Sequence, residues 1–172
     1  GVARPVVGLP GAGGTPRADV QICLDPKCTL AAELLGAVAG LSDRPRVILI
    51  GAAAEYGHVP LHAQPVVETF PCSPRTNYGV AKHAQSLLGL AAAMRGQQVL
   101  VARLFNPVGA GMPGELALPS FARRIIGSGP CSVMRVGALS AKRDFSDVNE
   151  PARLSWGCAS LSPRPGPGDT CV

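Results

Sequence analysis

Two residues near the middle of the chain have the types and spacing for acid–base chemistry. Tyr78 and Lys82 are four residues apart at the start of an alanine-rich apolar run that reaches Met94. In a helix this spacing places the phenol and the ammonium on one face. A neighbouring ammonium favours the phenolate and lowers the pKa of a tyrosine, so the phenol can exchange a proton near neutral pH. Taken alone the spacing is weak, because many helices carry it by chance on a solvated face.

Alternating apolar segments predict the elements that position this pair. The patterns indicate strands at Arg46–Ile50 and Gln98–Leu104, which flank a helix over Asn77–Arg95. Apolar strands that alternate with helices are typical of an α/β fold with a parallel sheet. Further elements are expected as follows: a strand stub at Val6–Val7, helices at Thr29–Leu41, Ala117–Ile126 and Val148–Leu161, a short strand at Ser132–Val136, and a strand at Asp169–Val172.

The composition indicates a globular protein that acts on an anionic small molecule. Hydrophobic residues make up 47% of the chain and charged residues 16%, and the formal net charge is +5. The basic residues are scattered and lack interleaved aromatic residues, which argues against nucleic-acid binding. No apolar run reaches transmembrane length and no secretion signal opens the sequence. We therefore expect a cytoplasmic protein with neither a nucleic-acid nor a membrane partner.

The cysteines and histidines do not predict a metal site. Without a Cys-x-x-Cys pair or a secretion signal, the cysteines are expected to be reduced and mostly buried. His58 and His62 have the spacing of metal ligands, but Pro60 between them disfavours a helix. We expect a loop pair that binds no metal. The cysteines are Cys23, Cys28, Cys72, Cys131, Cys158 and Cys171.

Several segments around the Tyr78–Lys82 pair occur in an order that identifies a family. Residues 47–57 form a buried-strand run that ends in small residues and Tyr56-Gly57, and residues 99–109 form a second strand that runs into a turn at Asn106-Pro107. Glu68, Pro71 and Pro74 precede Tyr78, and Arg143 opens an Arg-Asp-Phe motif. The set resembles the extended short-chain dehydrogenase/reductase family, the NAD-dependent epimerase/dehydratase group. From about Arg46 to Val148 it is most similar to GDP-mannose 4,6-dehydratases and GDP-4-keto-6-deoxymannose reductases.

The resemblance implies a fold and a division of the chain. It implies a Rossmann-like parallel sheet with flanking helices and part of a small substrate lobe. Residues 1–107 would be a partial NAD(P)-binding domain, and residues 108–172 the substrate-binding lobe and returning elements. The implied cofactor is NAD or NADP, and the implied partner is a nucleotide-sugar substrate. A homodimer formed through the Tyr78 helix is expected by analogy alone.

The resemblance also implies roles for individual residues. Tyr78 would exchange a proton with a sugar hydroxyl or ketone, and Lys82 would hold the nicotinamide ribose. Asn106 would contact the substrate. The guanidinium of Arg143 would bind the diphosphate with two parallel hydrogen bonds. Glu55 and Glu68 are expected to be structural.

Two interpretations remain for the glycines near the start of the chain. Gly8, Gly11 and Gly14 have the spacing of a turn that binds the cofactor pyrophosphate. Pro16 follows, however, and no acidic residue ends a second strand where the ribose would lie. The favoured alternative aligns Val6–Gly11 with the family's fourth strand, whose end also lies near the cofactor. On that interpretation the chain lacks the family's first three strands and is truncated at its amino end.

One site position departs from the family pattern. A serine or threonine usually lies four residues before the tyrosine of the Tyr-Gly pair, and here that position is Ala52. Alanine has no side-chain donor or acceptor. Ala54 replaces the acidic residue that dehydratases often carry, which argues against 4,6-dehydration more than against carbonyl reduction. We expect hydride transfer at C4 of a GDP-hexose. The alternatives are a UDP-sugar 4-epimerase and a non-catalytic remnant or binding module.

Overall fold

The structure, a computed structural model, describes residues 7–9, 25–43, 45–129, 132–137, 139–140, 142–160 and 170–171. Its larger sheet is parallel throughout and has the order β1-β2-β3-β6. These strands are β1 (Val7–Leu9), β2 (Val47–Ala52), β3 (Val99–Leu104) and β6 (Thr170–Cys171). The described strands thus follow chain order across the sheet without a reversal. The predicted parallel α/β fold is confirmed.

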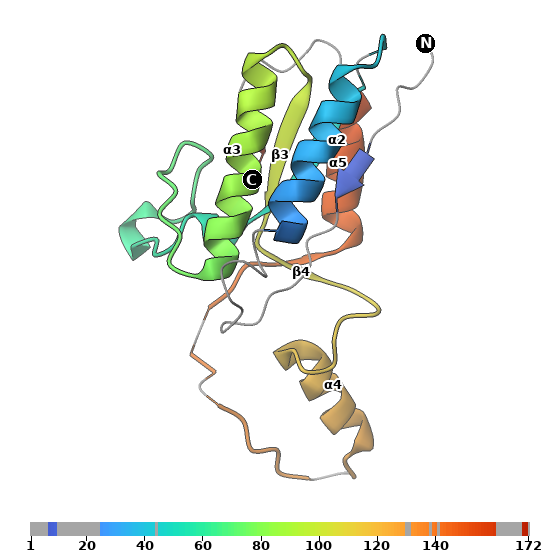
Figure 1. The fold of residues 1–172 in the computed structure, drawn as a ribbon. Helices are drawn as coiled ribbons and strands as arrows, with labels where there is room; N and C mark the ends of the chain where they lie inside the picture. The colour runs from blue at the N-terminus through green and yellow to red at the C-terminus, as the bar shows by residue number, and fades with distance from the viewer. Residues whose placement is uncertain are drawn as a thin grey trace.

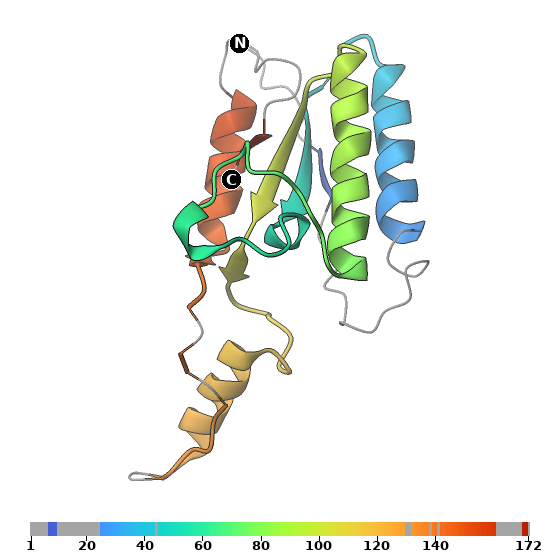
Figure 2. The same cartoon turned by 90° about the vertical axis from the view of Figure 1, so that its left-hand side faces the viewer.

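Helices cover both faces of this sheet (Figures 1 and 2). Helices α2 (Leu30–Ala39) and α3 (Asn77–Met94) lie side by side on one face, and α5 (Asn149–Ser160) covers the other. Because successive strand residues point to opposite faces, β2 and β3 divide their apolar side chains between two cores. The core under α2 and α3 contains Val47, Leu49, Val99 and Val101, and the core on the other face contains Ile48, Leu100 and Ala102.

Helix α3 has local signals at its start and a close fit to the sheet along its length. The Thr76 hydroxyl accepts a hydrogen bond from the backbone N–H of Gly79 at 3.0 Å and caps the first turn. Gly96 follows the helix with a positive φ of 88°. A Cβ at Gly89 would lie 2.6 Å from Cδ1 of Leu49, so a larger residue there would require the Leu49 side chain to move. The sequence prediction places this helix correctly to within one residue.

A second group of elements lies beyond the carboxyl end of β3. Strand β4 (Asn106–Val108) pairs in parallel with β5 (Phe145–Asp147), and α4 (Ala117–Gly127) extends away from the large sheet. The prediction that Asn106-Pro107 forms a turn is wrong, because this segment finds a partner in β5. The predicted strand at Ser132–Val136 is also wrong: no strand includes these described residues, and Val133 is 92% exposed.

The remaining predicted elements differ from the structure mainly at their ends. Residues Asp25–Thr29 form a short π-helix, η1, directly before α2. The predicted stub at Val6–Val7 corresponds to β1, and the predicted strand at 169–172 corresponds to β6. Among the described residues, no helix combines the length and the apolarity needed to cross a membrane.

Candidate active site

Lys82 ties the first turns of α3 to the carboxyl end of β2. Its side chain is almost completely buried, and its Nζ donates a hydrogen bond to the backbone oxygen of Ile50 at 2.7 Å. A second bond runs from Nζ to Oε1 of Gln85 at 3.1 Å. An ammonium has three donors, so these two bonds leave one N–H of Lys82 unassigned. The sequence predicted the helix position of this lysine but held no sign of its bond to the strand.

Burial changes the acidity of Lys82. The pKa of its ammonium falls to about 8, first because burial disfavours the charged form and second because Lys27 lies nearby. The carboxylate of Glu55 opposes this fall. The side chain therefore still carries its positive charge at neutral pH and begins to lose it in mildly basic solution.

Tyr78 lies on the first turn of α3 with its ring partly buried. Burial raises the pKa of its phenol, and the carboxylate of Glu55 raises it further. The expected lowering of this pKa by Lys82 is therefore wrong, because the ammonium of Lys82 bonds to Ile50 and Gln85 instead. The Nζ of Lys27 lies 5.5 Å from the centroid of the Tyr78 ring. At neutral pH Tyr78 is protonated and suited to donate a proton.

Gly79 brings Tyr78 close to the turn that follows β2. A Cβ at Gly79 would lie 2.5 Å from the backbone oxygen of Ala54, so no other residue fits without a shift of the chain. Residues Ala53–Glu55 form a 3₁₀ turn, η2, directly after β2. The closely packed pair of α3 and η2 therefore sets the first turn of α3 against the segment that carries Ala52.

A buried ion pair holds the η2 turn in place. The Glu55 side chain is completely buried, and its Oε1 accepts a hydrogen bond from the backbone N–H of Ala52 at 2.8 Å. Its Oε2 accepts a bond from Nε of Arg103 at 3.1 Å. Arg103 also donates to the hydroxyl of Tyr56 at 3.1 Å. Glu55 was expected to be structural, but nothing in the sequence indicated Arg103 as its partner.

Asn106 and the Arg143 segment meet beyond the end of β3. The Nδ2 of Asn106 donates a hydrogen bond to the backbone oxygen of Asp144 at 2.7 Å, across 38 residues of sequence. The β4–β5 pairing sets Asn106 opposite Phe145. Arg143 is exposed, and a hydrogen bond runs from its NH1 to the backbone oxygen of Lys142 at 2.8 Å. The structure thus brings the two predicted substrate segments together, and their contact with a substrate stays a prediction.

Comparison with known proteins establishes the family. Residues 12–165 match the family described as NAD dependent epimerase/dehydratase. The chain belongs to the NAD dependent epimerase/dehydratase family. The sequence resemblance to this family, based on Tyr78, Lys82 and the flanking motifs, is therefore confirmed.

Two members of the epimerase/dehydratase family match over part of their length. One is the dTDP-6-deoxy-L-talose 4-dehydrogenase (NAD(P)(+)) of Kitasatospora kifunensis, 31% identical over 125 residues, which are 70% of this chain and 39% of the relative. Another is the GDP-6-deoxy-D-mannose reductase of Pseudomonas aeruginosa, 32% identical over 136 residues, which are 73% of this chain and 45% of the relative. The chain thus spans less than half the length of both.

Solved structures of the family have the same fold. The RMD protein of Pseudomonas aeruginosa, solved with NADPH, superposes with a TM-score of 0.83 at 28% identity. The match covers 96% of this chain and 58% of RMD. The DesIV dTDP-glucose 4,6-dehydratase of Streptomyces venezuelae, solved with NAD and TYD, has a TM-score of 0.77 at 19% identity. That match covers 96% of this chain and 50% of DesIV, and at this identity it shows the fold alone.

The glycines considered for the family's cofactor loop are only partly described. Gly8 lies inside β1 and pairs with Ile48 of β2. Gly11, Gly14 and Pro16 lie outside the described residues. The structure therefore shows Gly8 as part of a strand, whereas the loop itself is not described.

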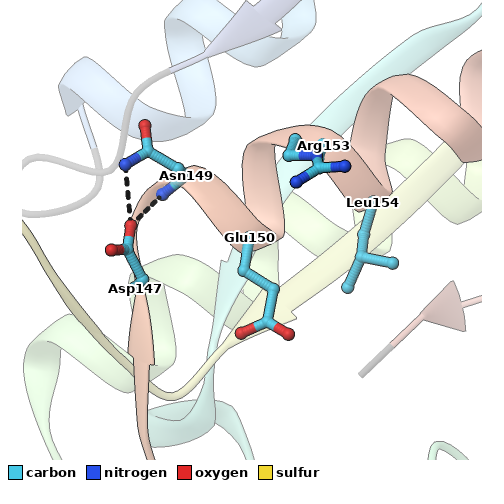
Figure 3. Close-up of a pocket in the computed structure, with 5 residues that line it drawn as sticks. All are labelled: Asp147, Asn149, Glu150, Arg153 and Leu154. Carbon is cyan, nitrogen blue, oxygen red and sulfur yellow. Dashed lines mark hydrogen bonds between the residues drawn. The ribbon is translucent and has the colours of Figure 1, made fainter.

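The structure also contains a pocket that the family motifs did not predict. It has a volume of about 620 Å³ and lies at the start of α5, lined by Asp147, Asn149, Glu150, Arg153 and Leu154 (Figure 3). Asp147 accepts hydrogen bonds at 2.8 Å from both the backbone N–H and the Nδ2 of Asn149, the first residue of α5. None of these residues was a predicted site residue, and neither Tyr78 nor Lys82 lines this pocket.

The histidines of the predicted loop pair are exposed, and the described cysteines are half-buried. His58 is exposed in the loop after Gly57, and His62 is exposed in the 3₁₀ helix η3 (Leu61–Ala63). Cys28 and Cys72 are each half-buried, whereas the cysteines were expected to be mostly buried. The side chains of Cys23, Cys131, Cys158 and Cys171 lie outside the described part.

Proposed function

We propose that this chain carries the proton-donating part of an NAD(P)-dependent nucleotide-sugar oxidoreductase. The proposed reaction is the reduction of GDP-4-keto-6-deoxymannose at C4. The observation that carries the proposal is the protonated Tyr78 on the first turn of α3, beside the buried Lys82 at the carboxyl end of β2. In open parallel sheets, ligands bind outside the carboxyl ends of the strands. The family and the reductase relative support the same assignment.

Lys82 and Tyr78 have the donors that a nicotinamide cofactor and a ketosugar would need. The third N–H of Lys82 is available for a ribose hydroxyl, because the other two are bound. The bound cofactor would supply the hydride to the ketone carbon. Tyr78 would donate its phenolic proton to the ketone oxygen and be reprotonated from solvent. Asn106 would contact the sugar, and the exposed Arg143 would bind the diphosphate.

The residues at the site favour reduction over the rival reactions. The phenol of Tyr78 carries its proton at neutral pH, as a donor to a ketone must, although its raised pKa makes it a weaker acid than a free tyrosine. A GDP-mannose 4,6-dehydratase must first oxidise the sugar and then remove a proton from it, and Ala54 offers no base at the position where dehydratases often have one. A UDP-sugar 4-epimerase also begins by oxidation, for which Tyr78 would have to accept a proton.

One observation favours the alternative of a non-catalytic scaffold. Ala52 provides no hydroxyl to bind the substrate oxygen, and the loss of one such donor typically costs about 100- to 1000-fold in rate. Its backbone N–H is already bound to Glu55. Under this alternative, Tyr78 and Lys82 would retain the family geometry without supporting turnover.

The sheet order favours the fourth-strand interpretation of residues 6–11. A doubly wound dinucleotide-binding sheet reverses its strand order at the cofactor crevice. Here β6 pairs with β3 rather than with β1, so the described strands all lie on one side of such a reversal. We propose on this basis that residues 1–107 form a partial cofactor domain, its later half, and that residues 108–172 form the substrate lobe and the elements α5 and β6, which return to the large sheet. Gly8 and Gly11 would then lie near the cofactor but would not form its pyrophosphate loop.

Comparison of two tyrosine variants tests the proposed function. The chain would be joined to the first three strands and cofactor loop of a related reductase and assayed for NADPH-dependent reduction of GDP-4-keto-6-deoxymannose. Tyr78→Phe should lower kcat at least about 100-fold, because it removes the transferable proton. Tyr56→Phe is the matched control, since its hydroxyl bonds to Arg103 inside the core. Equal rates for Tyr78→Phe and the parent, or no rate above background in the parent, would favour the scaffold alternative.

A further inference from the structure

Three side chains with different metal-binding atoms meet beside the η2 turn. They are the carboxylate of Glu55, the thiol of Cys72 and the imidazole of His83, and one donor atom of each lies within 4.8 Å of the others. Glu55 belongs to η2, Cys72 to the segment that leads into α3, and His83 to α3 itself. Oxygen, sulfur and nitrogen atoms from these three residue types are the usual ligands of zinc in proteins.

His83 has a buried ring nitrogen without a hydrogen bond. Its Nδ1 is buried and finds no hydrogen-bond partner among the described residues. The nearest charged atom is Oε2 of Glu55 at 3.7 Å, beyond hydrogen-bonding distance. A buried polar atom left without a partner costs about 1–3 kcal/mol. Buried polar atoms in proteins nearly always have a partner, so this nitrogen suggests a ligand that the described residues do not include.

The spacing of the three groups is close to that of a zinc site. Zinc bonds of about 2.0 Å to nitrogen or oxygen and about 2.3 Å to sulfur, at tetrahedral angles, set nitrogen and oxygen ligands roughly 3.3 Å apart and place sulfur roughly 3.5 Å from either. Nδ1 of His83 and Oε2 of Glu55, which lie 3.7 Å apart, would have to approach each other by about 0.4 Å. All three donor atoms lie within 4.8 Å of one another, so an approach of at most about 1.3 Å, taken up largely by Cys72, would complete the triangle. Cys72 lies in a segment without helix or strand, so such a movement disrupts no regular element.

The existing partners of Glu55 suit a metal-binding carboxylate. Ala52 and Arg103 each donate one hydrogen bond to it, one to each oxygen. A carboxylate has about four acceptor sites, so Glu55 keeps acceptor capacity for an ion. Carboxylates that bind metals are commonly oriented by hydrogen bonds of this kind. The positive charge of Arg103 opposes a cation, and the two anionic ligands, carboxylate and thiolate, outweigh it.

We propose that Glu55, Cys72 and His83 bind one zinc ion, which fastens the segment before α3 to the turn after β2. Thiolate and imidazole ligands select zinc over magnesium or calcium. On binding, the thiol of Cys72 releases its proton to solvent and a zinc–sulfur bond forms without any oxidation or reduction. A water molecule fills the fourth position. The ion stabilises the capped start of α3, and with it the position of Tyr78, without touching the reacting atoms.

Cobalt(II) absorption tests the site, because a cobalt–thiolate bond gives an ultraviolet charge-transfer band. The chain, kept reduced, should bind one cobalt ion with this band, and zinc should displace the cobalt. Cys72→Ser should remove the band, and His83→Gln should weaken cobalt binding at least about tenfold. The matched controls are Cys28→Ser and His62→Gln, which alter a half-buried thiol and an exposed histidine outside the cluster. Both controls should retain the band and the affinity of the parent.

Thermal unfolding gives an independent measurement. Zinc should raise the unfolding temperature of the parent and of both controls, because an ion that binds only the folded state stabilises it. Neither Cys72→Ser nor His83→Gln should show this rise. If Cys72→Ser fails to fold, His83→Gln decides the question by the same two measurements. The absence of a thiolate band in the parent, a band that survives Cys72→Ser, or equal loss in the controls would overturn the proposal.

Discussion

The ammonium of Lys82 and the backbone oxygen of Ile50 lie 2.7 Å apart, and this bond fixes the helix that carries Tyr78 to the end of the central strand β2. A single buried side chain thus positions the first turns of α3 at the carboxyl edge of the sheet. The burial that accompanies this bond also explains why the pKa of Lys82 is low.

Lys82 should make the stability of the fold depend on pH. Its pKa is about 8 in the folded chain, against 10.5 for an exposed lysine. Between these values the unfolded chain binds more protons, so the free energy of unfolding rises with pH. From pH 7 to pH 9 the expected rise is about 1 kcal/mol. Urea unfolding of the parent and of Lys82→Met should show the rise in the parent alone.

Glu55→Gln should destabilise the fold strongly. The substitution leaves the guanidinium of Arg103 buried without its counter-charge, and the loss of one partner of a buried ion pair costs about 3–5 kcal/mol. Glu68→Gln is the matched control, because Glu68 is exposed, and it should change stability by less than about 0.5 kcal/mol. Urea unfolding midpoints measure both. Similar midpoints for the two variants would show that the ion pair contributes little.

Two glycine-to-alanine changes in helices should have opposite effects. A Cβ at Gly79 would meet the backbone oxygen of Ala54 at 2.5 Å, so Gly79→Ala should destabilise the chain by about 1–3 kcal/mol. Gly36 in α2 has no atom within 4 Å of its would-be Cβ. Gly36→Ala should therefore stabilise the chain by about 0.5–1 kcal/mol through helix propensity. Thermal unfolding measures both, and effects of the same sign would contradict the packing described for α3.

Ala52→Thr should restore part of the activity expected for this site. In the chain joined to the amino-terminal half of a related reductase, the new hydroxyl should raise the reduction of GDP-4-keto-6-deoxymannose at least about tenfold, a fraction of the usual effect of one oxyanion donor. Adding Tyr78→Phe to this variant should abolish the gain. A rate equal to the parent would indicate that residues 52 and 78 do not act together.

The chain by itself should bind NADPH weakly or not at all. On the proposed fourth-strand interpretation, the described strands lie on one side of the order reversal at which a dinucleotide is held, and the pyrophosphate turn belongs to the other side. Isothermal titration with NADPH and NADH measures this directly. Dissociation constants in the low micromolar range would contradict the fourth-strand interpretation and would support Gly8, Gly11 and Gly14 as a working loop.

Sequence by itself determined the class of fold, the family and the main elements. The strands at 47–52 and 99–104 are mainly apolar runs, and α3 begins at a threonine cap, so local composition was enough to place them. The same local reasoning failed at Ser132–Val136 and at Asn106-Pro107. Whether a short apolar segment becomes a strand depends on a partner, and the partner of Asn106 lies in a segment nearly forty residues away.

Only the tertiary structure decided the electrostatics of the site. The sequence shows Tyr78 beside Lys82 and suggests a lowered tyrosine pKa, whereas burial and Glu55 raise it. The ion pair between Glu55 and Arg103 joins residues 48 positions apart. The meeting of Glu55, Cys72 and His83 likewise depends on the close fit of α3 to η2. Burial and contact between distant residues arise when the chain packs, and no local pattern of residue types specifies them.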